Sequence, residues 1–228
     1  MKIGILQTGH LPDDMRAAFG DYNAMFARLF EGRGFDYAVF NVVDMEFPDS
    51  LDAADAWLVT GSKHGVYEEH AFIAPLEQLL RDIRDKGAPL VGICFGHQII
   101  AQAFGGKVEK FEGGWCVGRQ SYQIAGKDVH LNAWHQDQVI TPPEGAVTMG
   151  RSDFCAHAAL SYGARILSIQ PHPEFDADVI DNLIKMRGPG VVPDPLLDHA
   201  RSGLEQPTHN QMLADMLADV LEMAKVPA

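Results

Sequence analysis

The sequence predicts an α/β fold in which a mostly parallel central sheet is flanked by helices. Short apolar runs alternate with longer amphipathic stretches as far as Gly106, and this alternation is typical of parallel α/β proteins. After Gly106 the pattern changes to short strand-like pieces joined by glycine-containing turns. This change predicts a small antiparallel excursion around residues 107–131.

The spacing of apolar residues places the individual elements. Short apolar runs predict buried strands at 2–7, 37–43, 56–60, 89–94 and 165–170. Apolar residues recurring every three or four positions predict helices at 21–32, 72–86, 97–104 and 177–186. The excursion consists of strand-like pieces at 107–111, 115–124 and 127–131.

The chain of 228 residues predicts a single domain over 1–228 with a helical C-terminal extension at about 188–228. Helices are expected in this extension at 195–202 and 210–224. The second of them carries apolar residues at spacings of three and four, which predict a face packed against the domain: Met212, Met216, Val220 and Met223.

Composition excludes several classes of function. The chain has 18 Lys and Arg residues against 31 Asp and Glu residues, a formal net charge of −13. Such an acidic chain is a poor ligand for nucleic acid or an anionic membrane, so neither partner is expected. The sequence shows no secretory signal and no apolar run long enough to span a membrane. The three widely spaced cysteines predict no disulfide framework, and a reducing cytoplasm is the expected location.

The most specific motif is GICFG, in which Cys94 has a glycine two positions before it and two after it. This is the pattern of a nucleophile on a sharp turn between a strand and a helix, where Gly92 and Gly96 are too close to their neighbours for a Cβ atom. The helix start favours a thiolate at Cys94. The N–H of Phe95 points where an oxyanion would form.

A second motif, QPHPEF, follows the last buried strand and therefore lies at the same edge of the sheet as Cys94. His172 can act as the base for Cys94, and Glu174 can bind the other ring nitrogen. A third motif, TGSKHGVY, follows the strand at 56–60, and its small residues Gly61 and Ser62 can bring a backbone N–H to a reacting carbonyl group. An ordinary βα turn is the alternative for this third motif.

No metal site is expected from the sequence. Cys94 and His97 form a C-x-x-H pair, but a lone pair without further Cys or His ligands rarely binds a metal. His97 and Gln98 are expected to support or line the pocket instead.

Together, GICFGHQ, PHPEF and TGSKHGVYE resemble the class I glutamine amidotransferase family, and in particular the glutaminase domain of GMP synthetase and its stand-alone relatives. The resemblance covers about residues 3–174. It implies a flavodoxin-like α/β core with Cys94, His172 and Glu174 as the catalytic residues. It also implies an oxyanion hole from the backbone of Gly61, Ser62 and Phe95.

The same resemblance implies that the substrate is L-glutamine or another γ-glutamyl compound and that no cofactor is required. Its expected substrate-binding residues are Gln98, Tyr67 and His135, the last from the stretch WHQD. Phe95 replaces the leucine common in the family, but its role there is a backbone N–H. The loop reads S-K-H-G where the GMP synthetase relatives more often have G-P-x-S.

Two enzyme functions remain open, and two alternative functions agree less well with the motifs. The first hypothesis is a glutaminase that releases ammonia, which a separate synthetase subunit can use, since the chain contains no phosphate-binding loop of its own. The second is a free-standing γ-glutamyl peptidase with the same thioester chemistry. A non-catalytic binding module is disfavoured by the intact Cys94, His172 and Glu174. A cysteine peptidase of similar fold often has histidine directly after the nucleophile, where this chain has Phe95.

Overall fold

The computed structural model describes residues 1–226 and contains a nine-stranded sheet in the order β2-β1-β3-β4-β11-β10-β9-β6-β7. Its first five strands are parallel: β2 (Asp36–Phe40), β1 (Lys2–Leu6), β3 (Ala56–Val59), β4 (Leu90–Ile93) and β11 (Ile166–Ile169). The carboxyl ends of β3, β4 and β11 therefore lie side by side. This confirms the predicted α/β fold, and the expected strands are found within one to three residues of their predicted ends.

The antiparallel part of the structure is larger than the predicted excursion at 107–131. Four antiparallel strands extend the main sheet: β10 (Ala159–Ser161), β9 (Val147–Arg151), β6 (Cys116–Ile124) and β7 (Lys127–His135). A separate two-stranded sheet pairs β5 (Lys107–Lys110) with β8 (Asp137–Thr141). The sequence does not reveal β8, β9 and β10 because these short strands bury few side chains in a regular alternation.

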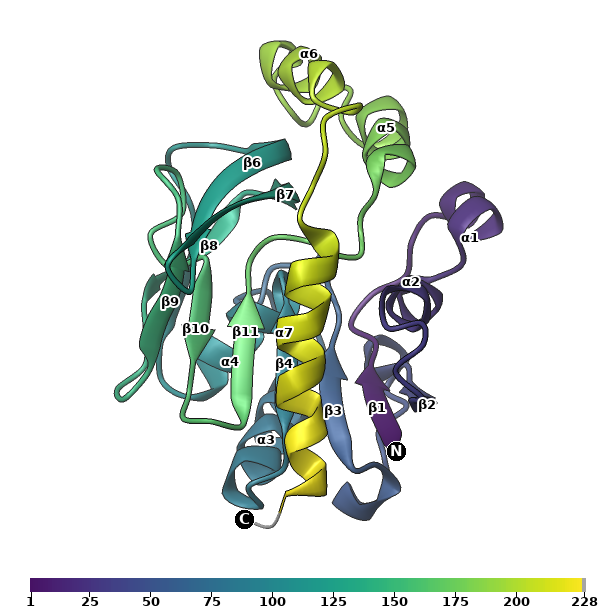
Figure 1. Ribbon diagram of the computed structural model, residues 1–228, viewed down its shortest axis with the longest axis vertical. Helices are drawn as coiled ribbons and strands as arrows, with labels where there is room; N and C mark the ends of the chain where they lie inside the picture. The colour runs from purple at the N-terminus through teal and green to yellow at the C-terminus, as the bar shows by residue number, and fades with distance from the viewer. Residues whose placement is uncertain (227–228) are drawn as a thin grey trace.

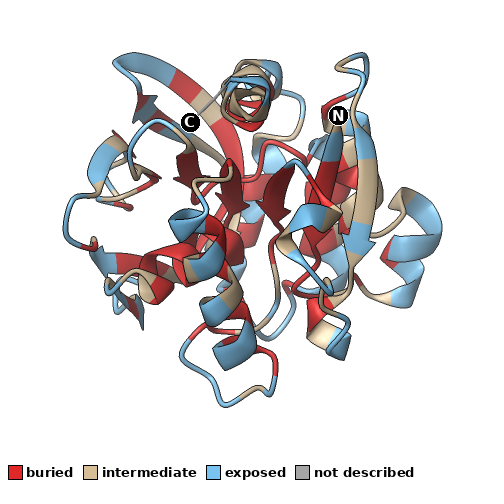
Figure 2. Ribbon diagram, turned by 90° about the horizontal axis from the view of Figure 1, so that it is seen from below, coloured by how far each residue is buried: buried red, intermediate tan, exposed pale blue. Residues whose placement is uncertain are grey.

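Helices cover both faces of the parallel strands (Figure 1). On one face, α2 (Tyr22–Leu29) and α7 (Asn210–Glu222) pack on the sheet, and on the other α3 (Ile73–Asp85) and α4 (Phe95–Ala103) do so. Side chains alternate between the faces along β3, so that Leu58 contacts the first pair of helices while Trp57 and Val59 contact the second. Figure 2 shows these buried strands at the centre and the exposed residues on the outer sides of the helices and loops.

A third hydrophobic cluster lies beyond the carboxyl ends of the strands. It joins α1 (Asp13–Phe19), α5 (Ala177–Met186) and α6 (Asp194–Ser202) through buried residues such as Met15 and Ile180. The helices α5 and α6 match their predicted positions. Helix α1 has no counterpart in the sequence predictions, because only one of its seven residues, Met15, is buried. Short 3₁₀ turns occupy Val42–Asp44, Leu51–Ala53 and Met223–Lys225.

Helix α7 packs through a different stripe from the one that the methionines predict. Its buried face consists of Leu213, Ala214, Leu217, Ala218 and Leu221, which contact β3, β4 and β11. Met212, Met216 and Val220 flank this face and are only partly buried, although they do pack against the same core. Within residues 1–226, no helix is long and apolar enough to cross a membrane.

Leu217→Ala is expected to lower the free energy of unfolding by about 2–5 kcal/mol, because it leaves a cavity against the parallel strands. Met216→Ala, the neighbouring but partly buried position, should lower it by less than half as much. Urea denaturation of the two variants beside the unmodified protein measures both losses. Equal losses would contradict the assignment of the Leu217 stripe as the buried face.

Candidate active site

Cys94 occupies a strained turn between β4 and α4. Its backbone angles are φ 53° and ψ −103°, in the left-handed half of conformational space that residues with a side chain rarely adopt. A Cβ atom on Gly92 would lie 2.6 Å from the carbonyl oxygen of Gly96. A Cβ atom on Gly96 would collide with the carbonyl group of Val59, whose carbon would be 2.9 Å away. These contacts are the steric reason that the motif requires both glycines.

His172 and Glu174 lie beside Cys94, on the segment that follows β11. The Nδ1 atom of His172 is 2.7 Å from Oε1 of Glu174, and both side chains are almost completely buried. His172 and Cys94 line the same cavity, and the backbone at Gly61 borders both side chains. Burial lowers the pKa of His172, but the neighbouring Glu174 and Cys94 side chains outweigh this effect and raise the pKa above its usual value. The arrangement therefore favours the protonated form of the His172 ring.

The antiparallel strand β7 holds the His172 segment in place. The N–H of His172 donates to the carbonyl oxygen of Asn132 at 2.8 Å, and the Asn132 amide donates to the carbonyl oxygen of Phe175 at 2.9 Å. The Phe175 ring stacks on the imidazole of His172 with 4.0 Å between ring centres and 2° between planes. Asn210, at the start of α7, donates to the same Phe175 carbonyl oxygen. Sequence reasoning did not find Asn132 or Asn210, which belong to no recognisable motif.

The loop after β3, which carries the motif TGSKHGVY, also lies beside Cys94 and His172. A Cβ atom on Gly61 would lie 3.0 Å from Cε1 of His172 and 3.8 Å from Cβ of Cys94, so the backbone after β3 borders both side chains. The hydroxyl of Ser62 donates to the carbonyl oxygen of Thr8 at 2.8 Å and so ties this loop to the one after β1.

Gln98, Tyr67 and His135 meet at one residue, Asp137. The amide of Gln98 donates to the Asp137 carbonyl oxygen at 2.8 Å, and the Tyr67 hydroxyl donates to the Asp137 carboxylate at 3.0 Å. Nδ1 of His135 lies 3.2 Å from that same carbonyl oxygen. Burial lowers the pKa of His135 to about 3, so this ring is neutral at physiological pH.

These residues surround a cavity of about 240 Å³ at the carboxyl edge of the parallel strands. Cys94 and His172 line it together with the three residues that contact Asp137. The lining also contains aromatic and cationic side chains to which the sequence analysis assigned no role: Tyr22, Trp115, Trp134, Lys63, Lys110 and Arg187. Trp115 directly precedes β6, Trp134 lies on β7 and Arg187 directly follows α5, so tertiary contacts that the sequence pattern does not predict bring them to the cavity.

The remaining residues named from the sequence lie away from the cavity. His97 is fully buried behind the turn, where its Nδ1 is 2.7 Å from the hydroxyl of Ser168 on β11. Cys116 and Cys155 are buried, and burial raises the pKa of each thiol to about 12. Both therefore remain protonated and unreactive at neutral pH.

The fold and the strained cysteine turn together define an α/β protein of the type in which a nucleophile stands between a strand and a helix. The sequence model of the glutamine amidotransferase class-I family matches residues 18–185. The chain therefore belongs to this family, as its motifs predict.

Individual relatives agree with this assignment. Gamma-glutamyl peptidase 3 of Arabidopsis thaliana is 27% identical over 87% of this chain and 87% of its own length. The glutamine-hydrolyzing GMP synthase of Clostridium kluyveri is 32% identical, over 52% of this chain and 24% of that protein. The crystal structure of a glutamine amidotransferase from Thermotoga maritima superimposes with a TM-score of 0.74 at 20% identity and covers 99% of each chain.

Gly96→Ala is expected to lower the free energy of unfolding by about 1–3 kcal/mol, because the added methyl group collides with the Val59 carbonyl group. Gly203→Ala is the matched control, since its Cβ would meet nothing closer than 3.5 Å and its φ of −94° suits alanine. Chemical denaturation measures both. If Gly96→Ala were as stable as the control, the close packing at this turn would be refuted.

Proposed function

We propose that this protein hydrolyses γ-glutamyl amide bonds, with Cys94 as nucleophile, His172 as general base and acid, and Glu174 as the group that orients His172. The observation that carries the proposal is the buried His172–Glu174 pair, whose histidine lines the same cavity as Cys94. A buried carboxylate on Nδ1 fixes the ring tautomer and stabilises the imidazolium form.

The proposed reaction has two steps. The Cys94 thiolate adds to the γ-carbonyl carbon, the C–N bond breaks, and the departing amine takes a proton from His172, which leaves a γ-glutamyl thioester. Water then gives a proton to His172 and attacks the thioester, which releases glutamate and restores the thiolate. The oxyanion of each step would be held by the N–H of Phe95 and by the backbone at Gly61 and Ser62. Each such donor typically contributes about 3–4 kcal/mol to the stability of the transition state.

A γ-glutamyl peptide is the substrate that the cavity favours. Ammonia as a leaving group needs no further contacts, whereas an amino acid or peptide needs room and partners for its side chain and carboxylate. The cavity lining provides such partners in Trp115 and Trp134, whose ring centres are 6.5 Å apart, and in the cations Lys110 and Arg187. The relatives named γ-glutamyl peptidases also match over most of this chain.

Hydrolysis of glutamine, which the sequence analysis placed first, is the second candidate. Its support is the similarity to GMP synthases, which match this chain over about half of its length. In that case the ammonia would pass to a separate synthetase subunit. A binding module without catalytic activity agrees poorly with the intact Cys94, His172 and Glu174. The cytoplasmic location stays a prediction from the sequence.

The first experiment offers the purified protein a γ-glutamyl dipeptide and L-glutamine separately and measures the release of glutamate. We expect a higher kcat/KM for the dipeptide, because only its leaving group is large enough to contact the aromatic and cationic side chains of the lining. Cys94→Ser should abolish both activities, and Cys116→Ala should retain them. A preference for glutamine would support the second candidate, and activity in Cys94→Ser would refute the proposed nucleophile.

Glu174→Gln should slow the reaction less than His172→Ala, because an orienting group contributes less than the base itself. It should also change the pH dependence. The carboxylate raises the pKa of His172, so its loss lowers that pKa, and the imidazolium then loses its proton at lower pH. The basic limb of the kcat/KM profile is therefore expected to move to lower pH. Glu112→Gln, an exposed position, is the control, and an unmoved basic limb in Glu174→Gln would contradict the role of Glu174.

A further inference from the structure

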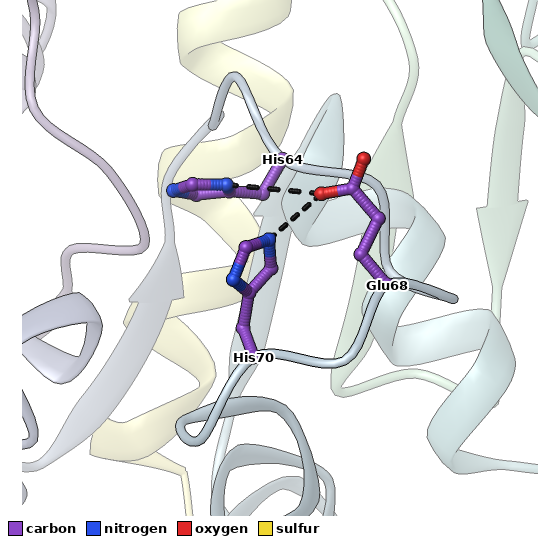
Figure 3. A group of neighbouring side chains, drawn as sticks. All are labelled: His64, Glu68 and His70. Carbon is purple, nitrogen blue, oxygen red and sulfur yellow. Dashed lines mark hydrogen bonds and ion pairs between the residues drawn. The ribbon is translucent and has the colours of Figure 1, made fainter.

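Two histidines and a glutamate converge in the loop between β3 and α3 (Figure 3). Nε2 of His70 lies 2.7 Å from Oε2 of Glu68, and Nδ1 of His64 lies 3.8 Å from the same oxygen. All three donor atoms lie within 4.8 Å of one another. Two ring nitrogens and one carboxylate oxygen therefore face a common point, and we refer to these residues as the His64–Glu68–His70 cluster.

The loop backbone and an aromatic neighbour hold these side chains in place. The N–H of Glu68 donates to the carbonyl oxygen of Gly65 at 3.1 Å, and the N–H of His70 donates to that of Glu68 at 3.0 Å. The ring of the buried residue Phe72 stacks on His70, with 5.8 Å between centres, and packs edgewise against His64 at 5.9 Å. The donor atoms are thus positioned before any ligand arrives.

The three side chains belong to the types that ligate metals, which bind neutral imidazole nitrogens and ionised carboxylate oxygens. A simple ion pair explains the cluster less well, because His70 alone satisfies the Glu68 oxygen and His64 at 3.8 Å adds no hydrogen bond to it.

We propose that His64, Glu68 and His70 bind a divalent transition-metal ion of the zinc class. Two imidazoles and one carboxylate are a common three-ligand set for zinc, and they leave a fourth position for water. The Glu68 side chain is 47% exposed, so an ion can enter from solvent. The sequence analysis expected no metal site because it weighed only the pair Cys94 and His97. The three residues of the cluster lie in a loop, where their spacing in the sequence does not predict that their side chains converge.

The cluster also borders the cavity of the candidate active site. His64 and Glu68 line that cavity, and His64 follows Gly61 and Ser62 by only a few residues. The hydroxyl of Ser62 accepts the N–H of His64 at 3.2 Å. A bound ion would fix the loop whose backbone borders Cys94 and would not take part in the thioester chemistry. The site therefore goes beyond the proposed hydrolysis and does not depend on it.

The test uses the full chain with Cys94→Ser, so that the Cys94 thiolate cannot act as a zinc ligand. After treatment with a chelator, Zn²⁺ is titrated in competition with a chromophoric chelator. We expect about one ion per chain and a dissociation constant that rises more than about tenfold in Glu68→Gln and in His70→Gln. Glu69→Gln, the adjacent exposed carboxylate, and His199→Gln, an exposed histidine elsewhere, should leave it unchanged.

Thermal unfolding of the same proteins gives a second measurement that requires no activity. Zn²⁺ should raise the unfolding midpoint of the Cys94→Ser chain and of Glu69→Gln, but not that of Glu68→Gln. The midpoint without metal shows that each variant is folded before it is compared. The proposal is overturned if the Cys94→Ser chain binds no Zn²⁺, or if Glu68→Gln and His70→Gln bind it as tightly as the controls.

Discussion

The close contact between the start of α4 and the end of β3 is the constraint on which the rest of the site depends. The N–H of Gly96 donates to the carbonyl oxygen of Thr60 at 3.1 Å, and no side chain fits between the two backbones. This contact sets where Cys94 can stand and how near the loop at Gly61 comes to it. Helix α4 must begin directly on the sheet for the thiol, the loop backbone and the His172 segment to meet.

The two halves of the sheet contribute different things to the cavity. The parallel half carries Cys94 and His172, at the ends of β4 and β11. The antiparallel half supplies the support, because Asn132 on β7 holds the His172 segment. Asp137, on β8 of the separate two-stranded sheet, contacts Gln98, Tyr67 and His135. The antiparallel strands therefore help to build the cavity and are not merely an addition to the α/β core.

The sequence predicted those strands and turns whose residue pattern directly reflects their place in the folded structure. The buried parallel strands are continuous apolar runs, and the glycines around Cys94 report a contact that only they permit. Asn132 could not be predicted, because its role comes from pairing with a segment 40 residues further along the chain, at His172. Helix α1 buries a single side chain, and strands β8 to β10 are too short and too irregularly buried to produce a periodic signal. The stripe on α7 was misplaced because leucine and alanine fill the narrow space above the sheet, and the methionines cover its margins.

The unequal surroundings of the three cysteines have a practical consequence. Cys94 alone lines the cavity, while Cys116 and Cys155 stay protonated inside the core. A small alkylating reagent at neutral pH should therefore consume one equivalent per competent molecule, without any cysteine having to be removed beforehand. The amount of reagent consumed per mole of protein then gives the fraction of molecules in which the turn at Cys94 is correctly folded. This measurement does not depend on which substrate the protein acts on.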